Sequence, residues 1–280
     1  MEKFNVFDEI SPLKCLCLCR ASYVPEFDSF ADDPVQSQKF KMQKWNKKKL
    51  IIELENFYEL LQRYNVDLKF LIPSKEHPWQ MYTRDTAFVV YDTLYFSRTR
   101  ERSDRIGEID ILLKSISKFS PSKIFEITQG KIEGGDVIVD NDCVYIGVSN
   151  RSSIKAIEQL TDFLPIYPVQ LGNKIMHLDT CFTILPKKNA LIFKDAFEKK
   201  DVEILGKRFN LIEVSRSEAH SMAINVLVIN PEVIVMHKAF KRLASLIEGK
   251  GIKVELVDFS EPNSLLGSFR CATLPLQRLY

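Results

Sequence analysis

The stretch EGGDVIVDNDCVYIGVSNR, residues 133–151, contains two short apolar runs, 137–139 and 144–146. Asp-Asn-Asp at 140–142 separates the runs, and these residues favour tight turns because their side chains bond to nearby backbone and tolerate left-handed backbone. Two apolar runs around such a turn predict a β-hairpin. A helical stretch and the apolar run 166–169 follow, so the complete unit is strand, turn, strand, helix, strand.

The same unit recurs along the chain. Its other hairpin runs are 88–90 with 94–96, 182–185 with 191–193, and 224–229 with 233–236. The helices of these units are expected around 109–118, near 196 and over 240–247. A fifth unit, with the strand 13–19, the helix 39–63 and the strand 68–72, lacks one strand. The C-terminal run 272–276 supplies that strand and closes a ring. The units begin roughly 40–50 residues apart, a period that is typical of repeat architectures.

These units predict one α/β domain over residues 1–280, built as a five-bladed pseudosymmetric propeller of ββαβ repeats. The helices argue against an all-β propeller. The hairpin in every unit argues against a doubly wound parallel sheet, because a hairpin pairs its strands antiparallel. Pairing of the N-terminal and C-terminal segments is expected to close the ring.

The charge balance gives no reason to expect a nucleic-acid or membrane partner. The chain has 39 Lys and Arg against 37 Asp and Glu, which is a net charge of +2. The first apolar stretch, 13–19, is too short for a signal-peptide core or a membrane span. We therefore expect a cytoplasmic protein.

Three of the six cysteines alternate with leucines in one predicted strand. Successive side chains of a strand point to opposite faces, so Cys15, Cys17 and Cys19 share one face. We interpret them as a buried strand face in a reducing compartment, although thiols on one face can also bind a metal ion. Six cysteines in 280 residues do not indicate a disulfide framework.

Polar residues stand directly before the first strand of several units. These sets are Arg84-Asp85, Glu133-Gly134-Gly135-Asp136, His177-Leu178-Asp179 and Arg270-Cys271. Equivalent positions in a ring of similar units face the same axis, so we expect these side chains to converge on one central pocket. That pocket would contain one cysteine, one histidine and four carboxylates.

This set of side chains is typical of cysteine chemistry on a cationic substrate. A cysteine within reach of a histidine is a nucleophile with its base. A triad needs one carboxylate to orient the histidine, whereas several acids match the five N–H donors of a planar guanidinium. Asp85, Asp179 and Glu133 are the candidates to bind it. The same residue types also bind zinc, but no CxxC, HxxxH or HExxH spacing occurs in the chain.

Four segments of the sequence resemble a known group of enzymes. They are YTRD at 82–85, IEGGDVIV at 132–139, HLDTCFT at 177–183 and RCATLPL at 270–276. Their order and spacing are similar to those of the guanidino-group-modifying enzymes, the pentein superfamily, and most closely to arginine deiminases. Dimethylarginine dimethylaminohydrolases and amidinotransferases are related members. The superfamily fold is a five-fold pseudosymmetric α/β propeller, which agrees with the repeat count.

The resemblance implies the catalytic roles. Cys271 attacks the guanidinium carbon and forms a covalent thiouronium intermediate. His177 protonates the departing amine and then activates water, a kind of proton transfer that is typically worth about 10²–10⁴-fold. Glu133 supports His177 or binds guanidinium nitrogens.

The resemblance also implies the substrate-binding residues. Asp85 and Asp179 bind the remaining guanidinium nitrogens, and Arg151 and Arg98 correspond to arginines that bind the substrate carboxylate. The expected partner is a small guanidino compound. No metal or organic cofactor is implied, and a homodimer is compatible with the sequence.

Two departures from the arginine deiminases concern the substrate. Residues 150–173 hold one predicted helix, so the inserted helical domain of arginine deiminases is absent, as in the compact dimethylarginine dimethylaminohydrolases. The segment 264–270 contains one glycine where arginine deiminases have a glycine-rich loop with a further arginine.

Several outcomes of the chemistry stay open. Hydrolysis of arginine or a derivative gives a ureido product such as citrulline, together with ammonia or an amine. Further hydrolysis gives ornithine, and transfer of the amidino group to an amine would make the protein an amidinotransferase. A non-catalytic arginine-binding protein on the same scaffold is the remaining alternative.

Overall fold

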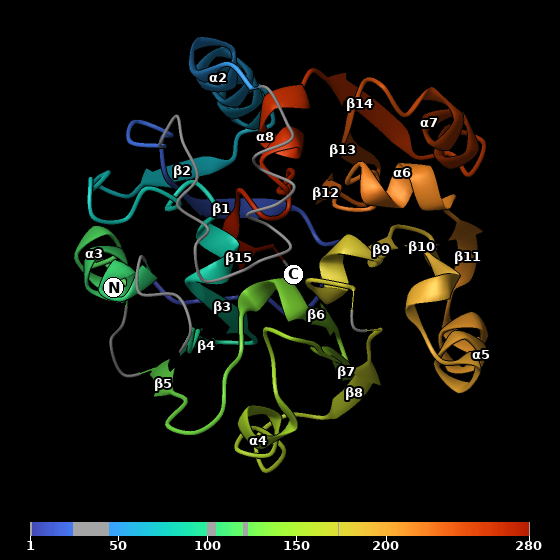
Figure 1. The fold of residues 1–280 in the computed structure, drawn as a ribbon, viewed down its shortest axis with the longest axis horizontal. Helices are drawn as coiled ribbons and strands as arrows, with labels where there is room; N and C mark the ends of the chain where they lie inside the picture. The colour runs from blue at the N-terminus through green and yellow to red at the C-terminus, as the bar shows by residue number, and fades with distance from the viewer. Residues whose placement is uncertain (1, 25–44, 100–104, 120–122, 173, 280) are drawn as a thin grey trace.

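Five three-stranded sheets surround one axis in the part of the chain that the structure describes (Figure 1). The computed structural model describes residues 2–24, 45–99, 105–119, 123–172 and 174–279. In each sheet the middle strand pairs antiparallel with one neighbour and parallel with the other. The five-bladed α/β ring that the repeats predict is confirmed.

Four blades follow the chain in order. Their strands are β3 (Ala87–Val90), β4 (Thr93–Phe96) and β5 (Ile124–Glu126); β6 (Val137–Asp140), β7 (Cys143–Val148) and β8 (Ile166–Gln170); β9 (Phe182–Leu185), β10 (Asn189–Ile192) and β11 (Asn210–Glu213); β12 (Leu227–Asn230), β13 (Val233–His237) and β14 (Lys253–Val257). The fifth blade combines strands from near both ends of the chain, in the order β15 (Leu274–Arg278), β1 (Leu13–Leu18) and β2 (Asp67–Phe70).

Most of the helices lie around the outside of the ring, as Figure 1 shows for α2, α3, α4, α5 and α7. The helices are α2 (Lys47–Arg63), α3 (Glu108–Ser115), α4 (Ile154–Ile157), α5 (Lys199–Arg208), α6 (Arg216–His220), α7 (Lys241–Glu248) and α8 (Ser260–Ser264). Between β7 and β8 the chain holds only α4, so no inserted helical domain is present there. None of the helices in the described ranges is both long and apolar enough to cross a membrane.

The hairpin turns follow from their residues. Asp140 pairs with Cys143, and Asn141 between them has a φ of 42°. Asn tolerates this left-handed backbone better than most residues, as the Asp-Asn-Asp sequence predicts. Lys187 and Lys188 in the β9–β10 turn have φ values of 58° and 57°. Two successive positive φ values are those of a type I′ turn, whose twist suits a hairpin.

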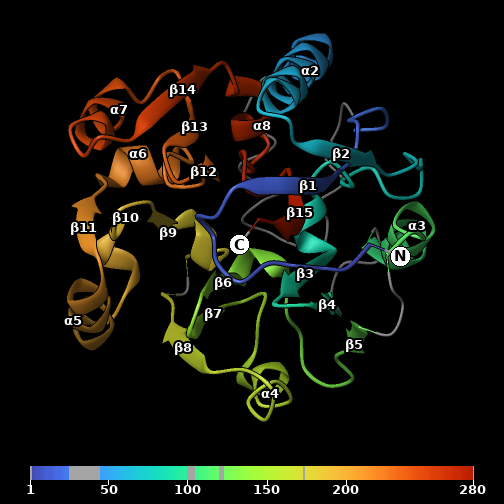
Figure 2. The same cartoon turned by 180° about the vertical axis from the view of Figure 1, so that it is seen from behind.

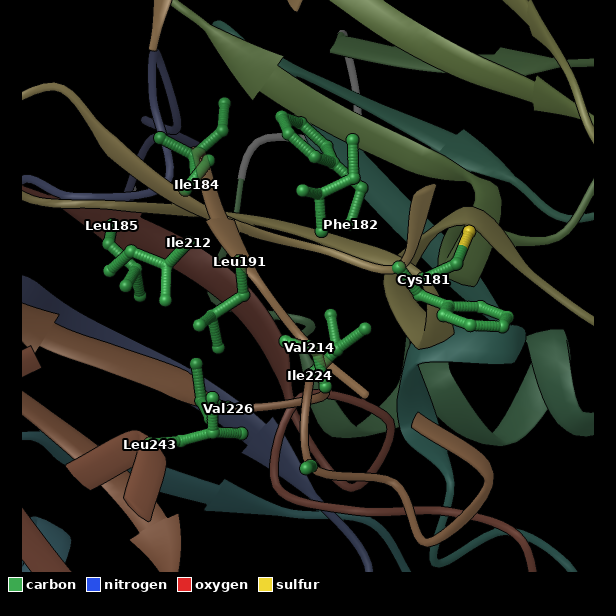
Figure 3. Close-up of a cluster of buried hydrophobic side chains, with 14 of the residues drawn as sticks. Cys181, Phe182, Ile184, Leu185, Leu191, Ile212, Val214, Ile224, Val226 and Leu243 are labelled. Atoms are coloured by element: carbon green, nitrogen blue, oxygen red, sulfur yellow. The ribbon is translucent and has the colours of Figure 1, made fainter. Parts of the chain in front are cut away.

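Apolar side chains fill the spaces between neighbouring blades. One cluster joins Phe182 and Ile184 of β9 to Val226 before β12 and Leu243 of α7 (Figure 3). These side chains are buried. Removal of their surface from water holds the blades against one another, at roughly 25 cal/mol per Å² of apolar surface.

The alternating cysteines lie as the sequence predicts. Cys15, Cys17 and Cys19 are buried in one apolar cluster, whereas Leu16 and Leu18 pack into another. Burial raises the pKa of the Cys15 and Cys19 thiols to about 12. The interpretation as a buried strand face is confirmed.

Several element boundaries differ from the sequence-based expectation. The strand expected over 224–229 begins at Leu227. Asn225 lies before the strand, and its side chain bonds to the backbone of Cys271 and Asp179. The closing strand expected over 272–276 begins at Leu274, because a turn in which Thr273 bonds to the preceding backbone comes first.

The helices show similar differences. The helix expected near residue 196 is one 3₁₀ turn, Lys194–Ala196, and the helix of that blade is α5. The helix expected over 109–118 ends at Ser115. The long helix expected over 39–63 is present from Lys47, and residues 39–44 lie outside the described part of the chain.

Replacing Leu61 with Ala should destabilise the protein by about 2–5 kcal/mol, because Leu61 is fully buried on the inner face of α2 and its loss leaves a cavity. Ile52→Ala on the same helix is the matched control, since Ile52 is 59% exposed and its replacement should change stability by less than about 0.5 kcal/mol. Urea unfolding followed by circular dichroism measures both. Equal losses in the two variants would contradict the assigned packing of α2.

Candidate active site

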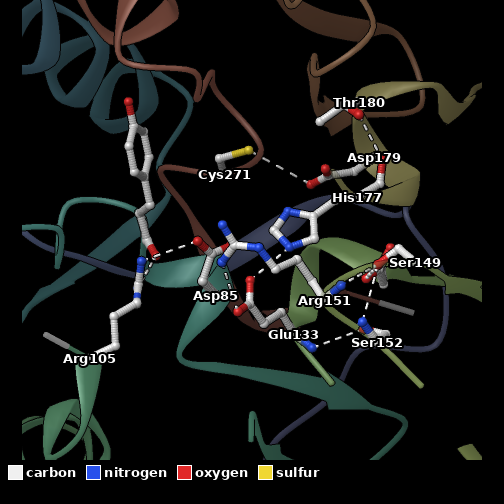
Figure 4. A network of polar contacts seen from close by, with 12 residues as sticks. Asp85, Arg105, Glu133, Ser149, Arg151, Ser152, His177, Asp179, Thr180 and Cys271 are labelled. Atoms are coloured by element: carbon white, nitrogen blue, oxygen red, sulfur yellow. Dashed lines mark hydrogen bonds and ion pairs between the residues drawn. The ribbon is translucent and has the colours of Figure 1, made fainter. Parts of the chain in front are cut away.

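Short turns place polar side chains at the ring axis. The 3₁₀ turns Thr83–Asp85, Gly134–Asp136 and Leu178–Thr180 stand directly before β3, β6 and β9. These are the positions at which the sequence repeats its polar residues. The ring therefore brings segments nearly 200 residues apart to one place (Figure 4).

A pocket opens at this axis. The space between its lining atoms, with the open solvent at its mouth included, is about 350 Å³. Its lining residues are Trp79, Tyr82, Asp85, Arg105, Arg151, Met176, His177, Leu265, Leu266, Gly267 and Cys271. Four residues that the sequence predicts, Cys271, His177, Asp85 and Arg151, surround the same space (Figure 4).

The imidazole of His177 pairs with Glu133 behind the pocket wall. Nε2 of His177 lies 2.8 Å from Oε2 of Glu133, and both side chains are buried. Burial opposes the charged imidazole, but the hydrogen bond to Glu133 and the charges of Asp136 and Asp85 raise the pKa of His177 to about 9. His177 is therefore an imidazolium at neutral pH, and its Nδ1 has no hydrogen-bond partner within the described ranges.

The absence of a side chain at Gly135 leaves the space that the imidazole of His177 occupies. A Cβ at residue 135 would lie 2.6 Å from Nδ1 of His177, closer than any non-bonded contact tolerates. Gly134 has a similar constraint, because a Cβ there would lie 2.2 Å from the backbone oxygen of Arg84. The two glycines of the Glu133–Asp136 motif are thus required by close approach.

The thiol of Cys271 lies beside Asp179. The distance from Sγ to Oδ2 of Asp179 is 3.9 Å, and the backbone N–H of Cys271 donates to Asn225 at 3.0 Å. Burial raises the pKa of the Cys271 thiol well above its ordinary range, and the carboxylates of Asp179 and Asp85 raise it further. The free protein therefore holds a protonated thiol.

In Asp85 and in Asp179, one carboxylate oxygen accepts a hydrogen bond from an arginine and the other has no partner among the described residues. Oδ2 of Asp85 accepts from Arg105 at 3.1 Å, and Oδ2 of Asp179 accepts from Arg270 at 2.9 Å. The Oδ1 atoms of both carboxylates have no hydrogen-bond partner among the described residues. A buried acceptor without a donor costs roughly 1–3 kcal/mol, so these atoms favour a ligand that carries N–H groups.

Two arginines line the pocket, and only one of them was predicted. Nη1 of Arg151 donates to Glu133 at 3.2 Å. Arg105 binds Asp85 and Glu108 and donates to the backbone oxygen of Tyr82 at 2.9 Å. The sequence offered little signal for Arg105, because its segment contains several arginines and its partner in the pocket lining, Asp85, lies 20 residues away in the chain.

The structure places Arg98 outside the pocket lining. Its backbone bridges to Ile132, and its Nη1 lies 3.5 Å from the backbone oxygen of Ile127. The bridge holds Arg98 at the side of the blade, whereas Arg105 enters the pocket. Asp136 is fully buried and accepts from the backbone of Leu178 at 2.9 Å.

Asp85, Glu133 and His177 each offer a ligand atom within 4.8 Å of the other two, a geometry that could hold a metal ion. Arg105 and Arg151 already bind two of these residues, so protein cations match much of the negative charge that a metal ion would need. The three ligands come from distant segments, and for this reason no spacing motif marks them in the sequence.

A five-bladed α/β ring whose axial pocket joins a cysteine, a histidine and carboxylates defines a guanidino-group-modifying protein of the pentein superfamily. Residues 23–278 match the family described as "N,N dimethylarginine dimethylhydrolase, eukaryotic". The chain belongs to this family.

Relatives and solved structures agree with this assignment. The chain is 36% identical over 223 residues to the uncharacterized protein YkgA of Bacillus subtilis, covering 79% of this chain and 77% of the relative. It is 27% identical over 229 residues to the N(G),N(G)-dimethylarginine dimethylaminohydrolase of Pseudomonas aeruginosa, covering 80% and 87%.

Two solved structures share the fold. The N-terminal domain of ArgZ, covalently bound to a reaction intermediate, superposes with a TM-score of 0.83 at 19% identity, covering 94% of this chain and 98% of the other. A dimethylarginine dimethylaminohydrolase variant with an S-methyl-L-thiocitrulline adduct superposes with a TM-score of 0.78 at 24% identity, covering 94% and 99%.

Replacing Glu133 with Gln should lower the pKa of His177 well below about 9, because burial then opposes the imidazolium with only the charges of Asp136 and Asp85 left to favour it. NMR titration of ¹³C-labelled histidine measures the change. The other three histidines of the chain provide the internal control and should titrate as in the unmodified protein. A His177 pKa that stays near 9 would show that Glu133 does not set its charge.

Proposed function

We propose that residues 1–280 form a single catalytic domain that hydrolyses a guanidinium C–N bond of arginine or an arginine derivative. The observation that carries this proposal is the shared pocket of Cys271 and His177, with unpartnered oxygens of Asp85 and Asp179 close by. Family membership supports the same reaction class, since the named relatives include dimethylarginine dimethylaminohydrolases and arginine deiminases.

The pocket suits the two ends of such a substrate. Asp85 and Asp179 offer acceptors to the guanidinium. Arg151 lines the pocket and is 9% exposed, so it is the arginine that we assign to the substrate carboxylate. The apolar side chains of Trp79 and Leu265 suit the methylene stem or N-methyl groups.

Binding of the cation prepares the nucleophile. In the free enzyme the thiol of Cys271 is protonated and the imidazole of His177 is charged. A guanidinium beside the thiol favours the thiolate, because an opposite charge within about 4–6 Å lowers the pKa of an acid. Loss of the thiol proton to water or to a neighbouring carboxylate then leaves a thiolate next to an imidazolium.

The thiolate attacks the guanidinium carbon and forms a C–S bond. His177 donates a proton to the departing nitrogen, the C–N bond breaks, and ammonia or an amine leaves an S-alkyl thiouronium on Cys271. Neutral His177 then takes a proton from a water molecule that attacks the same carbon. The C–S bond breaks, the thiolate returns, the hydroxyl proton of the adduct is lost to solvent, and the ureido product leaves. Proton transfer of this kind contributes typically about 10²–10⁴-fold.

Incubation with arginine, monomethylarginine, asymmetric dimethylarginine and decarboxylated arginine should give a ureido product from at least one of them. Colorimetric detection of the product and mass spectrometry of the amine identify the substrate and the bond that breaks. Cys271→Ser should lower turnover by about 10³-fold or more, because serine is a far weaker nucleophile. Cys143→Ser, which lies in β7 outside the pocket lining, is the control and should retain full activity.

Each other outcome has its own meaning. Turnover that Cys271→Ser leaves unchanged would refute the mechanism. A guanidino product formed only when an amine acceptor is added would indicate an amidinotransferase, and ornithine with two molecules of ammonia would indicate a dihydrolase. Binding without turnover of any compound would indicate a non-catalytic binding protein.

The value of kcat/KM should peak at alkaline pH. It rises as Cys271 loses its proton and falls as His177 loses its proton near pH 9, so the productive thiolate–imidazolium pair is a minor form at neutral pH. Between about pH 6 and pH 8, the logarithm of kcat/KM should rise by about one per pH unit. Steady-state kinetics across this range test it, and a decline over the same interval would contradict the assigned proton states.

A further inference from the structure

The N-terminal segment, residues 2–12, crosses the rear of the ring before β1 begins (Figure 2). Val6 exchanges backbone hydrogen bonds with Tyr91 in the β3–β4 turn, and Phe7 accepts one from Asn141 in the β6–β7 turn. The segment therefore ties neighbouring blades together. It lies before the residues that match the family.

Glu9 extends from this segment into the ring axis. Its side chain is 8% exposed, and its Oε1 lies 2.8 Å from Nη2 of Arg270. The other terminal nitrogen of Arg270 lies 2.9 Å from Oδ2 of Asp179, which is 3.9 Å from the sulfur of Cys271. These contacts form one continuous series, the Glu9–Arg270–Asp179 chain, from the rear of the ring to the nucleophile.

Several buried guanidiniums surround the Glu9–Arg270–Asp179 chain. Arg84, Arg270 and Arg278 are all buried near Glu9. Burial opposes the Glu9 carboxylate, but these three guanidiniums lower its pKa to about 2, so Glu9 is charged at any working pH. Crowding is also visible at Arg84, where burial and the charge of Arg270 lower the pKa to about 9.

We propose that Glu9 is a positioning residue that shares the charge of Arg270, so that Asp179 keeps its negative charge for the cationic substrate. Without Glu9, Arg270 would have Asp179 as its one carboxylate partner among the described residues. The guanidinium would then neutralise Asp179 more completely. The expected effect on substrate binding rests on the proposed function, whereas the expected effect on the Cys271 thiol does not.

Two measurable properties should then change in opposite senses. Loss of the Glu9 charge leaves more positive charge beside Cys271, which lowers the pKa of its thiol. The other charged or titratable groups that face this thiol or act on it include Asp179, Asp85, Arg270, Tyr82 and His177. The same excess charge repels a guanidinium, so the substrate binds more weakly. General structural damage would weaken binding but has no reason to make the thiol more acidic.

The test uses the full chain with Glu9→Gln. Cys271 is alkylated with iodoacetamide across a pH series, and mass spectrometry of the Cys271 peptide gives the rate, which separates this thiol from the other five. The expected midpoint lies lower than in the unmodified protein by roughly 0.5–1 pH unit. With the substrate that the panel identifies, KM should rise by roughly tenfold while kcat changes less.

Glu2→Gln is the matched control, because it makes the same chemical change on the same segment at a residue that bridges to Phe119, away from the axis. Its alkylation midpoint and KM should equal those of the unmodified protein. An alkylation midpoint of Glu9→Gln that is unchanged or higher overturns the proposal, whatever happens to KM.

The double variant Glu9→Gln, Arg270→Gln tests whether Glu9 acts through Arg270. It removes the carboxylate together with its guanidinium, and replacing a whole buried pair by neutral groups often leaves a protein folded. Its alkylation midpoint should return to the unmodified value or lie above it. A midpoint below that of the unmodified protein overturns the proposal, and this comparison holds even if Glu9→Gln alone does not fold.

Failure of the proposed function can be told apart from failure of the role assigned to Glu9. If no guanidino compound is turned over, the alkylation midpoints of the three variants still decide whether Glu9 controls the charge beside Cys271. If turnover occurs and the midpoints do not move, the proposed function stands and the role of Glu9 is refuted.

Discussion

Mutual neutralisation of buried charges at the ring axis is the constraint on which the rest of this structure depends. Glu133 lies between His177 and Arg151, and Asp179 is bound by Arg270. A charge that is buried without a partner costs several kcal/mol, and the pairs Glu133–His177 and Asp179–Arg270 each join two different blades. The ring can therefore close only with the blades in an arrangement that pairs the charges, and the same arrangement assembles the pocket.

This pairing leaves the pocket in a resting state rather than an active one. Glu133 keeps His177 protonated, and the carboxylates around Cys271 keep its thiol protonated as well. The oxygens that Asp85 and Asp179 leave unpartnered are buried acceptors, which a ligand with N–H donors can satisfy. A guanidinium supplies those donors and also brings the positive charge that stabilises a thiolate, so binding and activation depend on the same feature of the substrate.

Local rules predicted the features that repeat. The period of the hairpins gave five blades, and the polar residues before several of the first strands predicted a common pocket, in which Cys271 and His177 are found. The alternation of Cys15 and Cys17 with Leu16 predicted a buried cysteine face, and the structure buries the leucine face as well. These predictions succeed because periodicity is a property of neighbouring residues, and a repeat carries the same local pattern to equivalent places in space.

Partners that depend on long-range contacts could not be predicted in this way. Four arginines stand between residues 98 and 105, and no local pattern distinguishes Arg105, which lines the pocket, from Arg98, which does not. The sequence predicts Asn225 as part of a strand, but in the structure its side chain accepts a hydrogen bond from the backbone N–H of Cys271. Glu9 is 261 residues from Arg270 along the chain. The rule that buried charges need partners shows that such residues must exist, but only the closed ring determines which residues they are.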